Sequence, residues 1–263
     1  VRSSMSRMDG RKAVVTGAAG GIGKAIASLY AREGAKVVIV DLNQEAADET
    51  AHEVGAVAAF ACDVTQMQSV EKMSTQAVLA LGEVDTLVNN AGIPGRGFLV
   101  DIDAALIDRV ISVNVKGVIL ASKAFAPHLI QVGKSGRDAS IINMSSQAGK
   151  KGWPELTVYS ASKAAVLGFS RGLAVELGPN VRVNSICPGY ISAAGMFWRN
   201  WSQAGDKEKT PEERGAEFAA KHWPLARLQS PEDVANAALF LASSEAQEIT
   251  GQAINVAGGV VMD

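Results

Sequence analysis

Residues 14–23 read Val-Val-Thr-Gly-Ala-Ala-Gly-Gly-Ile-Gly and join an apolar run to the start of an amphipathic helix pattern. Glycines let the backbone turn tightly and approach a pyrophosphate, which the N-terminus of the following helix attracts. The generic fingerprint Gly-x-Gly-x-x-Gly is not met, because Ile26 stands where its third glycine belongs. The pattern is Thr-Gly-x-x-x-Gly-x-Gly, with Gly17, Gly21, Ile22 and Gly23 as the expected cofactor contacts. On this motif alone, a glycine-rich turn without a ligand remains the alternative.

Outward from this turn, short apolar runs alternate with helix patterns along the whole chain. Valine- and isoleucine-rich strands separated by helices indicate a parallel sheet that is covered on both faces. We therefore predict an α/β fold, a doubly wound Rossmann-like sheet of about seven strands in one domain over residues 1–263, with its ligand crevice at the carboxyl ends of the strands. The expected strands are 13–16, 36–40, 56–62, 86–89, 140–143, 182–186 and 252–256, and the clearest helices are 22–33, 66–81, 160–177 and 231–241.

One segment, 193–224, breaks this rhythm because it is long, charged and rich in tryptophan. Long excursions from compact domains are usually functional lids or disordered segments. We expect an irregular segment that serves as a substrate lid.

Composition limits the function classes. Of the 263 residues 48% are hydrophobic and the net charge is −2, so no basic field favours nucleic acid or an anionic membrane. Residues 1–12 are polar and basic, and no apolar run reaches the length of a membrane span, so we expect a soluble cytoplasmic protein. Cys62 and Cys187 are expected as buried free thiols, and three scattered histidines predict no metal site.

Asp41 closes the second expected strand, eighteen residues after Gly23. A carboxylate at this place can accept hydrogen bonds from the adenosine ribose hydroxyls and repels a 2′-phosphate. No lysine or arginine falls within the glycine turn or directly after Asp41. The sequence therefore favours NAD over NADP, with a helix-capping role for Asp41 as the alternative.

A second group of candidate catalytic residues is Tyr159 and Lys163, which are four residues apart. Tyr159 follows Ser146 by thirteen residues. Side chains four residues apart share one face of a helix. A lysine ammonium beside a phenol is expected to lower the pKa of the phenol toward working pH, which makes tyrosine a usable acid and base. Such pairs also arise by chance on amphipathic helices, so the dinucleotide-type beginning of the chain decides the interpretation.

Together these motifs resemble the short-chain dehydrogenase/reductase family over nearly the whole chain. The matching elements are the glycine turn, Asp63-Val64, Asn89-Asn90-Ala91-Gly92, Asn114, Ser146, Tyr159, Lys163 and Pro188-Gly189. The resemblance implies an NAD-dependent oxidoreductase in which Tyr159 is the general acid/base. It implies that Lys163 lowers the pKa of Tyr159 and holds the nicotinamide ribose, that Ser146 binds the substrate oxygen, and that Asn114 holds a water of a proton relay.

For the cofactor, the resemblance implies contacts from the residues that follow the strands. Asp63 and Val64 hold the adenine, Asn90, Ala91 and Gly92 line the cofactor through their backbone, and Pro188, Gly189 and Ile191 lie at the nicotinamide end. Ser145 adjoins Ser146, and the family's spacing to the tyrosine selects Ser146. One departure is Ala193, where the family often has a threonine, and Ser192 is the nearest hydroxyl.

The hydrolase pattern Gly-x-Ser-x-Gly also occurs, at 168–172. That motif needs a strand before it and a sharp exposed turn, whereas the residues before it continue the expected helix of Tyr159 and Lys163. We reject a nucleophile elbow here.

The substrate is the least determined part. All four tryptophans fall where the family places substrate, and aromatic faces suit the C–H faces of sugars. The stretch 143–151 is similar to that of polyol and sugar dehydrogenases. We expect a polyol or sugar alcohol held by Ser146, Gln147, Trp153, Tyr159 and Trp198, with Glu155 as a further hydroxyl ligand.

Two alternatives stay open: reduction of apolar or cyclic ketones on the same site, and a non-catalytic NAD-binding regulator built on the same fold. The family resemblance also implies a homotetramer, and the apolar C-terminal stretch 256–263 is consistent with burial against a neighbour.

Overall fold

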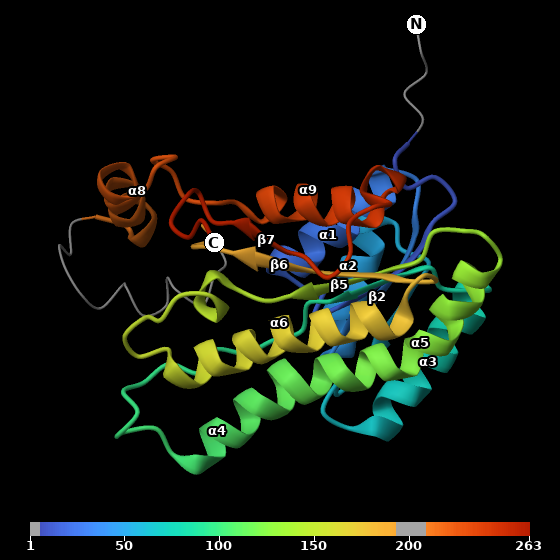
Figure 1. The fold of residues 1–263 in the computed structure, drawn as a ribbon, viewed down its shortest axis with the longest axis horizontal. Coiled ribbons are helices and arrows are strands. Elements are labelled where there is room, and N and C mark those ends of the chain that lie inside the picture. Colours follow the sequence, from blue (N-terminus) through green and yellow to red (C-terminus); the bar gives the residue numbers. More distant parts are fainter. Residues whose placement is uncertain (1–5, 193–208) are drawn as a thin grey trace, which may run out of the picture.

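The computed structural model describes residues 6–192 and 209–263, which are built around a seven-stranded sheet (Figure 1). Every neighbouring pair is parallel, and the strand order is β3-β2-β1-β4-β5-β6-β7. The order reverses between β1 and β4, which creates the switch point where doubly wound sheets bind ligands. The strands are β1 (Lys12–Thr16), β2 (Lys36–Asp41), β3 (Ala58–Ala61), β4 (Thr86–Asn89), β5 (Ser140–Met144), β6 (Arg182–Pro188) and β7 (Ala253–Val256).

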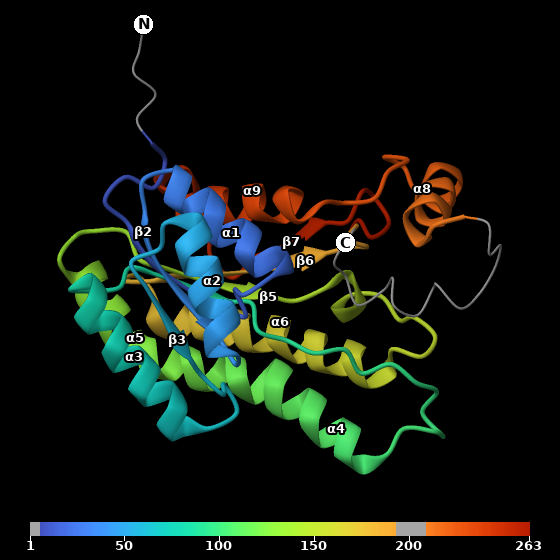
Figure 2. The same cartoon turned by 180° about the vertical axis from the view of Figure 1, so that it is seen from behind.

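Helices cover both faces of the sheet (Figures 1 and 2). One layer holds α1 (Gly21–Arg32), α2 (Gln44–Val54) and α9 (Pro231–Ala242). The other holds α3 (Met67–Leu81), α5 (Val118–Lys134) and α6 (Thr157–Leu177). A π-helical turn, Ser112–Gly117, joins α4 (Ala104–Ile111) to α5, and 3-10 turns occur at Gln147–Gly149 and Ser244–Ala246. Within the described ranges, no helix is both long and apolar enough to cross a membrane.

The strands form the middle of the core because their alternate side chains pack against different layers. Val15 and Ile39 join the cluster around α1 and α9, with Ile26 among its members. Val14 joins the opposite cluster, where Phe125 of α5 is buried. Both strand faces are therefore apolar, which is why the strands read as continuous hydrophobic runs. The predicted doubly wound sheet is confirmed, with β3 shorter than the expected 56–62.

At the amino ends of the strands, an ionic network joins β1, β4, β5 and β6. Arg11 pairs with Asp85 (Nε–Oδ1, 3.0 Å) and with Asp138 (Nη1–Oδ2, 3.0 Å). Arg182 grips Asp138 with two hydrogen bonds of 2.9 Å and donates to the carbonyl of Leu241 at the end of α9. The four charged side chains are at most 16% exposed, so each carboxylate is paired where it is largely withdrawn from water.

A chain of buried hydrogen bonds between polar side chains joins β4, β5 and β6 to helix α6. Asn89 of β4 donates to Asn143 of β5 (2.8 Å), and Asn143 donates to Ser170 of α6 (2.9 Å). Ser185 of β6 donates to the same hydroxyl of Ser170 (2.8 Å). Ser170 is thus a buried helical residue, and the rejected nucleophile elbow is excluded by its position inside α6.

The segment expected to be irregular contains a regular helix, α8 (Pro211–His222). Thr210 caps it, and Glu213 completes a capping box. The same order of residue types, Ser-Pro-Glu-Asp at 230–233, caps α9, and the sequence analysis used that signal there. The expectation of an irregular 193–224 is therefore wrong for 211–222, while Ala193 and Trp198 lie outside the described residues.

Candidate active site

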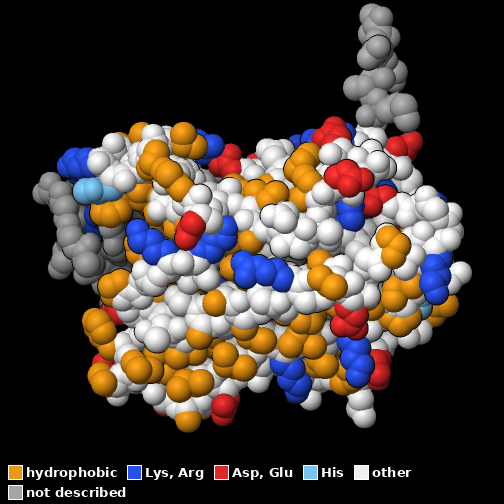
Figure 3. Space-filling model, in the orientation of Figure 1, with side chains coloured by type: hydrophobic (Ala, Val, Ile, Leu, Met, Phe, Trp, Pro, Cys, Tyr) orange, Lys and Arg blue, Asp and Glu red, His pale blue; other side chains and the backbone are white. Residues whose placement is uncertain are grey.

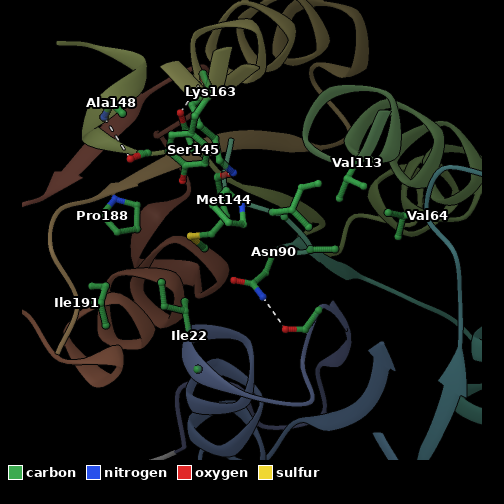
Figure 4. Close-up of a pocket in the computed structure, with 18 of the residues that line it drawn as sticks. Ile22, Val64, Asn90, Val113, Met144, Ser145, Ala148, Lys163, Pro188 and Ile191 are labelled. Carbon is green, nitrogen blue, oxygen red and sulfur yellow. Dashed lines mark hydrogen bonds between the residues drawn. The ribbon is translucent and has the colours of Figure 1, made fainter. Parts of the chain in front are cut away.

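A cavity of about 510 Å³ opens at the carboxyl ends of the strands. Figure 4 shows side chains from α1 (Ile22), the loop after β4 (Asn90), β5 (Met144) and α6 (Lys163) converging on it. Of the predicted cofactor and substrate residues, all line it except Gly23 and Glu155, and Trp198 lies outside the described part of the chain. Asn114 lies just behind the described lining. The sequence analysis missed several lining residues: Val40, Leu42, Cys62, Ile93, Pro94, Arg96, Val113, Met144, Ala148, Leu156 and Tyr190.

The glycine turn after β1 is packed so tightly that two positions tolerate no side chain. A Cβ at Gly17 would lie 2.7 Å from Cα of Ala91, and the backbone there has φ +62°. A Cβ at Gly23 would lie 2.3 Å from the carbonyl oxygen of Gly17. Asn90 fastens this turn by donating to the same carbonyl at 2.8 Å. The glycines thus bring the turn and the loop after β4 into direct contact.

The next helix presents its N-terminus to the cavity. No described side chain caps α1 at Gly20, and its first turn carries no acidic residue. Gly21 has φ +54°, and a Cβ there would meet no described atom within 4 Å. An uncapped helix N-terminus above an open glycine floor suits a pyrophosphate, because the free N–H groups and the helix dipole both attract an anion. The residues present therefore fit a dinucleotide.

Asp41 ends β2 at the rim of the cavity. One of its carboxylate oxygens accepts from the backbone N–H of Ala19 (3.0 Å) and the other from that of Leu42 (2.8 Å). The side chain that caps α2 is Asn43, which accepts from the N–H of Ala46. The alternative of Asp41 as the helix cap is therefore wrong.

Asp63 and Val64 follow β3 on the same side of the cavity. The carboxylate of Asp63 accepts from the backbone and the hydroxyl of Thr65 (2.9 and 2.7 Å) and so shapes its own turn. Val64 lies opposite Pro188 and Ile191 across the cavity in Figure 4.

Tyr159 and Lys163 lie one turn apart on α6, with the ammonium of Lys163 5.7 Å from the centre of the phenol ring. Burial raises the pKa of Tyr159 to about 12, and a hydrogen bond with the side chain of Ser146 opposes this shift. Burial lowers the pKa of Lys163 to about 8, and its Nζ donates to the carbonyl of Met144 at 2.8 Å. The expected lowering of the phenol's pKa by the lysine is wrong for these side chains alone, because burial raises that pKa and the opposing effect comes from the hydrogen bond with Ser146.

The two neighbouring serines have different partners. Ser145 donates its hydroxyl to the carbonyl of Lys163 at 2.8 Å and is buried. Ser146 accepts from the N–H of Ala148 and keeps its hydroxyl beside Tyr159. Of the two, only Ser146 has its hydroxyl next to the phenol.

Asn114 stands in the π-helical turn between α4 and α5, a type of distortion common at functional sites. Its side chain accepts from the N–H of Ile93 (2.8 Å) and donates to Ser162 of α6 (3.1 Å). A Cβ on Gly92 would lie 3.3 Å from Oδ1 of Asn114 and 3.4 Å from Nζ of Lys163. The amide thus lies behind Gly92, on the same side as the lysine.

The far end of the cavity, here called the outer wall, consists of Pro94, Arg96, Gln147, Trp153, Leu156 and Tyr190. The rings of Trp153 and Tyr190 meet edge to face (5.8 Å), and Tyr190 stacks on Trp223 (5.0 Å). Oε1 of Gln147 and Nε1 of Trp153 are buried without a hydrogen-bond partner in the described structure. Buried polar atoms without partners are costly, so these two are available to a ligand.

Glu155 departs from its expected role as a hydroxyl ligand. The described lining does not include it, and its carboxylate pairs with Arg96. Arg96 and Tyr190 were missed, although Tyr190 directly follows the Pro188-Gly189 motif and Arg96 lies four residues after Gly92. Across residues 6–192 and 209–263, no group of three or more His, Cys, Asp or Glu side chains is arranged to hold a metal ion.

Comparison with known proteins agrees with this site. Residues 17–261 match the family model described as enoyl-(acyl carrier protein) reductase. The chain is 39% identical to 3-oxoacyl-[acyl-carrier-protein] reductase of Thermotoga maritima, covering 97% of this chain and 100% of that protein. It is 38% identical to sorbitol dehydrogenase of Cereibacter sphaeroides, covering 96% and 98%. The solved structure of 7α-hydroxysteroid dehydrogenase with NADH and 7-oxo glycochenodeoxycholic acid superposes with a TM-score of 0.86 at 35% identity, covering 100% and 99%.

The glycine turn, the switch-point cavity and these full-length similarities lead to one conclusion: the chain belongs to the short-chain dehydrogenase/reductase family, whose members are oxidoreductases acting on CH–OH groups.

Proposed function

We propose that the protein reversibly oxidises a secondary alcohol of a polyol or sugar to the ketone, with NAD as the hydride acceptor. The observation that carries this proposal is the grouping of Tyr159, Ser146 and Lys163 in a cavity that also contains the uncapped N-terminus of α1. A proton-transfer group and a dinucleotide-type floor thus share one cavity.

In the oxidation, the phenolate of Tyr159 takes the proton of the substrate hydroxyl while the C–H bond of the same carbon breaks. Ser146 hydrogen-bonds the substrate oxygen and fixes it near the phenol. Lys163 lies 5.7 Å from the phenol ring, where its positive charge stabilises the phenolate. The bound cofactor supplies the electron-pair acceptor for the departing hydride.

Asp41 supports NAD over NADP, because its carboxylate sits at the rim where a 2′-phosphate would meet a negative charge. The related 7α-hydroxysteroid dehydrogenase, solved with NADH, supports the same choice.

The polar atoms of the outer wall support a hydroxylated substrate. Oε1 of Gln147 can accept from a hydroxyl, and Nε1 of Trp153 can donate to an oxygen. The similarity to sorbitol dehydrogenase points the same way. The second candidate is reduction of an apolar or cyclic ketone, favoured by the packed rings of Trp153, Tyr190 and Trp223 and by the steroid named for the structural relative.

The test is to mix the protein with NAD or NADP and a panel of polyols, sugars and cyclic or aliphatic secondary alcohols, following the ultraviolet absorbance of the reduced cofactor. Turnover of polyols with NAD is the expected result. Turnover of cyclic alcohols alone would select the second candidate. A Tyr159→Phe variant with undiminished turnover would refute the mechanism, and no turnover on any alcohol, with NAD still bound, would favour a regulator.

We also propose that the protein assembles as a homotetramer. Figure 3 shows apolar side chains gathered over the face that α4 and α6 form. Ile111, Ile119 and Val175 are 40%, 38% and 84% exposed on α4, α5 and α6. Such a face supports subunit contact, and light scattering that gives the mass of a monomer would contradict it.

A further inference from the structure

The outer wall carries a positive charge, on Arg96, and no negative charge. Of its six residues only Arg96 is charged, and the lining there includes no carboxylate. Its other members are the apolar or aromatic Pro94, Trp153, Leu156 and Tyr190, with the amide of Gln147. The side chain of Arg96 is 35% exposed, so its guanidinium lies where a ligand in the cavity and solvent can both reach it.

Arg96 is fixed by Glu155, but not all of its N–H donors are used in that ion pair. Its Nε and Nη2 both donate to the same oxygen, Oε2 of Glu155. Arginine and a carboxylate pair best as two parallel hydrogen bonds to two oxygens. Here Nη1 of Arg96 has no partner among the described residues, so one edge of the guanidinium remains available to an oxygen ligand.

The loops hold the pair in place at the cavity. The N–H of Gly97 donates to the carbonyl of Glu155 at 2.9 Å, which ties the loop after β4 to the loop before α6. Glu155 adopts the left-handed backbone conformation, φ +62°, which non-glycine residues rarely use. Arg96 also interacts electrostatically with Tyr190. Burial raises the pKa of the Tyr190 phenol, and the positive charge of Arg96 opposes this rise.

Further donors lie close by. The ammonium of Lys151 lies 5.2 Å from the ring centre of Trp153 and has no carboxylate partner among the described residues. The unpartnered Nε1 of Trp153 belongs to the same ring. Arg96 in the wall, the indole N–H of Trp153 and the nearby ammonium of Lys151 therefore offer hydrogen-bond donors at or beside this end of the cavity.

Building on the proposed function, we propose that the substrate alcohol carries an anionic group, a carboxylate or a phosphate monoester, at the end remote from the reacting carbon, and that Arg96 binds this group. Glu155 occupies the guanidinium when no anion is present and orients it toward the cavity. Arg96 is thus a specificity-determining residue, and the anion competes with Glu155 for it.

The experiment compares a hexitol, its 6-phosphate and the corresponding aldonate as substrates with NAD. The measured quantity is the ratio of kcat/KM for each anionic substrate to kcat/KM for the hexitol. In Arg96→Gln we expect this ratio to fall about 10–100-fold, through KM rather than kcat, the size of a lost charge-assisted bidentate contact. Arg96→Lys is expected to restore part of it, because lysine keeps the charge and loses the fork.

Two further variants sharpen the test. Glu155→Gln removes the competing carboxylate and is expected to lower KM for the anionic substrates. Arg137→Gln is the matched control, because Arg137 makes a similar bidentate ion pair with Glu83 outside the cavity; it should leave the ratio unchanged. Preference for the phosphate, the aldonate or both identifies the anion.

An unchanged ratio in Arg96→Gln, or a wild type that prefers the neutral hexitol, overturns the proposal while leaving the proposed function intact. If no alcohol is turned over, the proposed function fails, and the inference is decided by calorimetric titration of the protein with the aldonate and with inorganic phosphate in the presence of NADH. Binding that is lost in Arg96→Gln then supports the anion site, and equal or absent binding to both proteins rejects it.

Discussion

The two ends of the sheet handle charge in opposite ways. At the amino ends, Arg11, Asp85, Asp138 and Arg182 are nearly buried and joined in one network. At the carboxyl ends, the N-terminus of α1 has no side-chain cap among described residues, and Lys163 is buried with a lowered pKa. One end uses its charges to join strands, whereas the other leaves polar groups unsatisfied and available to ligands. The difference in charge and hydrogen bonding identifies the carboxyl end of the sheet as the functional end, independently of any comparison with related proteins.

The strongest test of this contrast is Tyr159→Phe. We expect kcat/KM to fall about 100–10,000-fold, because the proton-transfer group is lost, while the free energy of unfolding stays the same or rises. Steady-state kinetics and urea denaturation on the same preparations measure both. A large loss of stability would show that side chains at the carboxyl end of the sheet also contribute to the stability of the fold.

The reciprocal change is Asp138→Ala at the amino end. It removes a carboxylate shared by Arg11 and Arg182, so two largely buried guanidinium groups lose a partner. We expect a loss of about 3 kcal/mol in the free energy of unfolding, with kcat/KM unchanged well below the melting temperature. A variant that unfolds normally and loses activity would contradict the separation of the two ends.

Asp41→Ala tests the cofactor rim. The preference for NAD over NADP, taken as a ratio of kcat/KM values, is expected to fall about 10–100-fold, because one charge–charge repulsion of roughly 1–3 kcal/mol disappears. The decisive outcome is the ratio, since loss of the contact with Ala19 also affects both cofactors equally. An unchanged ratio would assign Asp41 to the turn alone.

The buried lysine gives a pH signature. The pKa of Lys163 is lowered from 10.5 to about 8, so between these values the unfolded chain holds a proton that the folded chain has lost. Stability contributed by this group therefore rises with pH in that window. Relative to Lys163→Met, the wild type should gain about 1–3 kcal/mol from pH ~8 to ~10.

Urea denaturation of both proteins at several pH values measures this gain. The comparison with Lys163→Met is needed because Tyr159, Cys62 and Cys187 have raised pKa values and titrate in the opposite sense in both proteins. A difference that does not change with pH would place the ammonium in contact with water.

The smallest effect is expected for Arg137→Gln, at the amino end but on the surface. Its pair with Glu83 is exposed, with side chains 53% and 30% accessible. Exposed pairs contribute little because water screens them, so we expect no measurable change in melting temperature or activity. A clear loss of stability would extend the amino-end network to the surface.

Much of the molecule follows from the sequence because local chemistry and fold agree there. The apolar runs placed all seven strands, and the glycines at 17 and 23 predicted a tight turn after the first strand. The structure shows this turn, and a Cβ at either position would lie less than 3 Å from backbone atoms. Tyr159 and Lys163 share a face of α6 as their spacing required. These features depend on periodicity and on backbone geometry, which a sequence carries directly.

Other features depend on surroundings that no spacing encodes. The pKa of Tyr159 is raised because the fold buries it, and neither its neighbour nor its motif reveals that depth. Arg96 enters the cavity and pairs with Glu155, 59 residues away, only after two loops meet. The helix α8 is different, because Thr210, Pro211 and Glu213 form a local capping signal that predicts its start. The tryptophans and charges of this segment were read as marks of an irregular lid, and the capping signal was missed.

The polar chain of Asn89, Asn143, Ser170 and Ser185 has a consequence for how the protein folds. A parallel pair such as β4 and β5 can gain its apolar contacts in more than one alignment, yet only one alignment brings these amides and hydroxyls together. Since Ser170 belongs to the helix that carries Tyr159, correct strand alignment and docking of that helix satisfy the same hydrogen bonds. A shift of register between β4 and β5 would therefore also remove hydrogen bonds that hold the helix of Tyr159 against the sheet, so strand alignment and the placement of the reactive group depend on the same contacts.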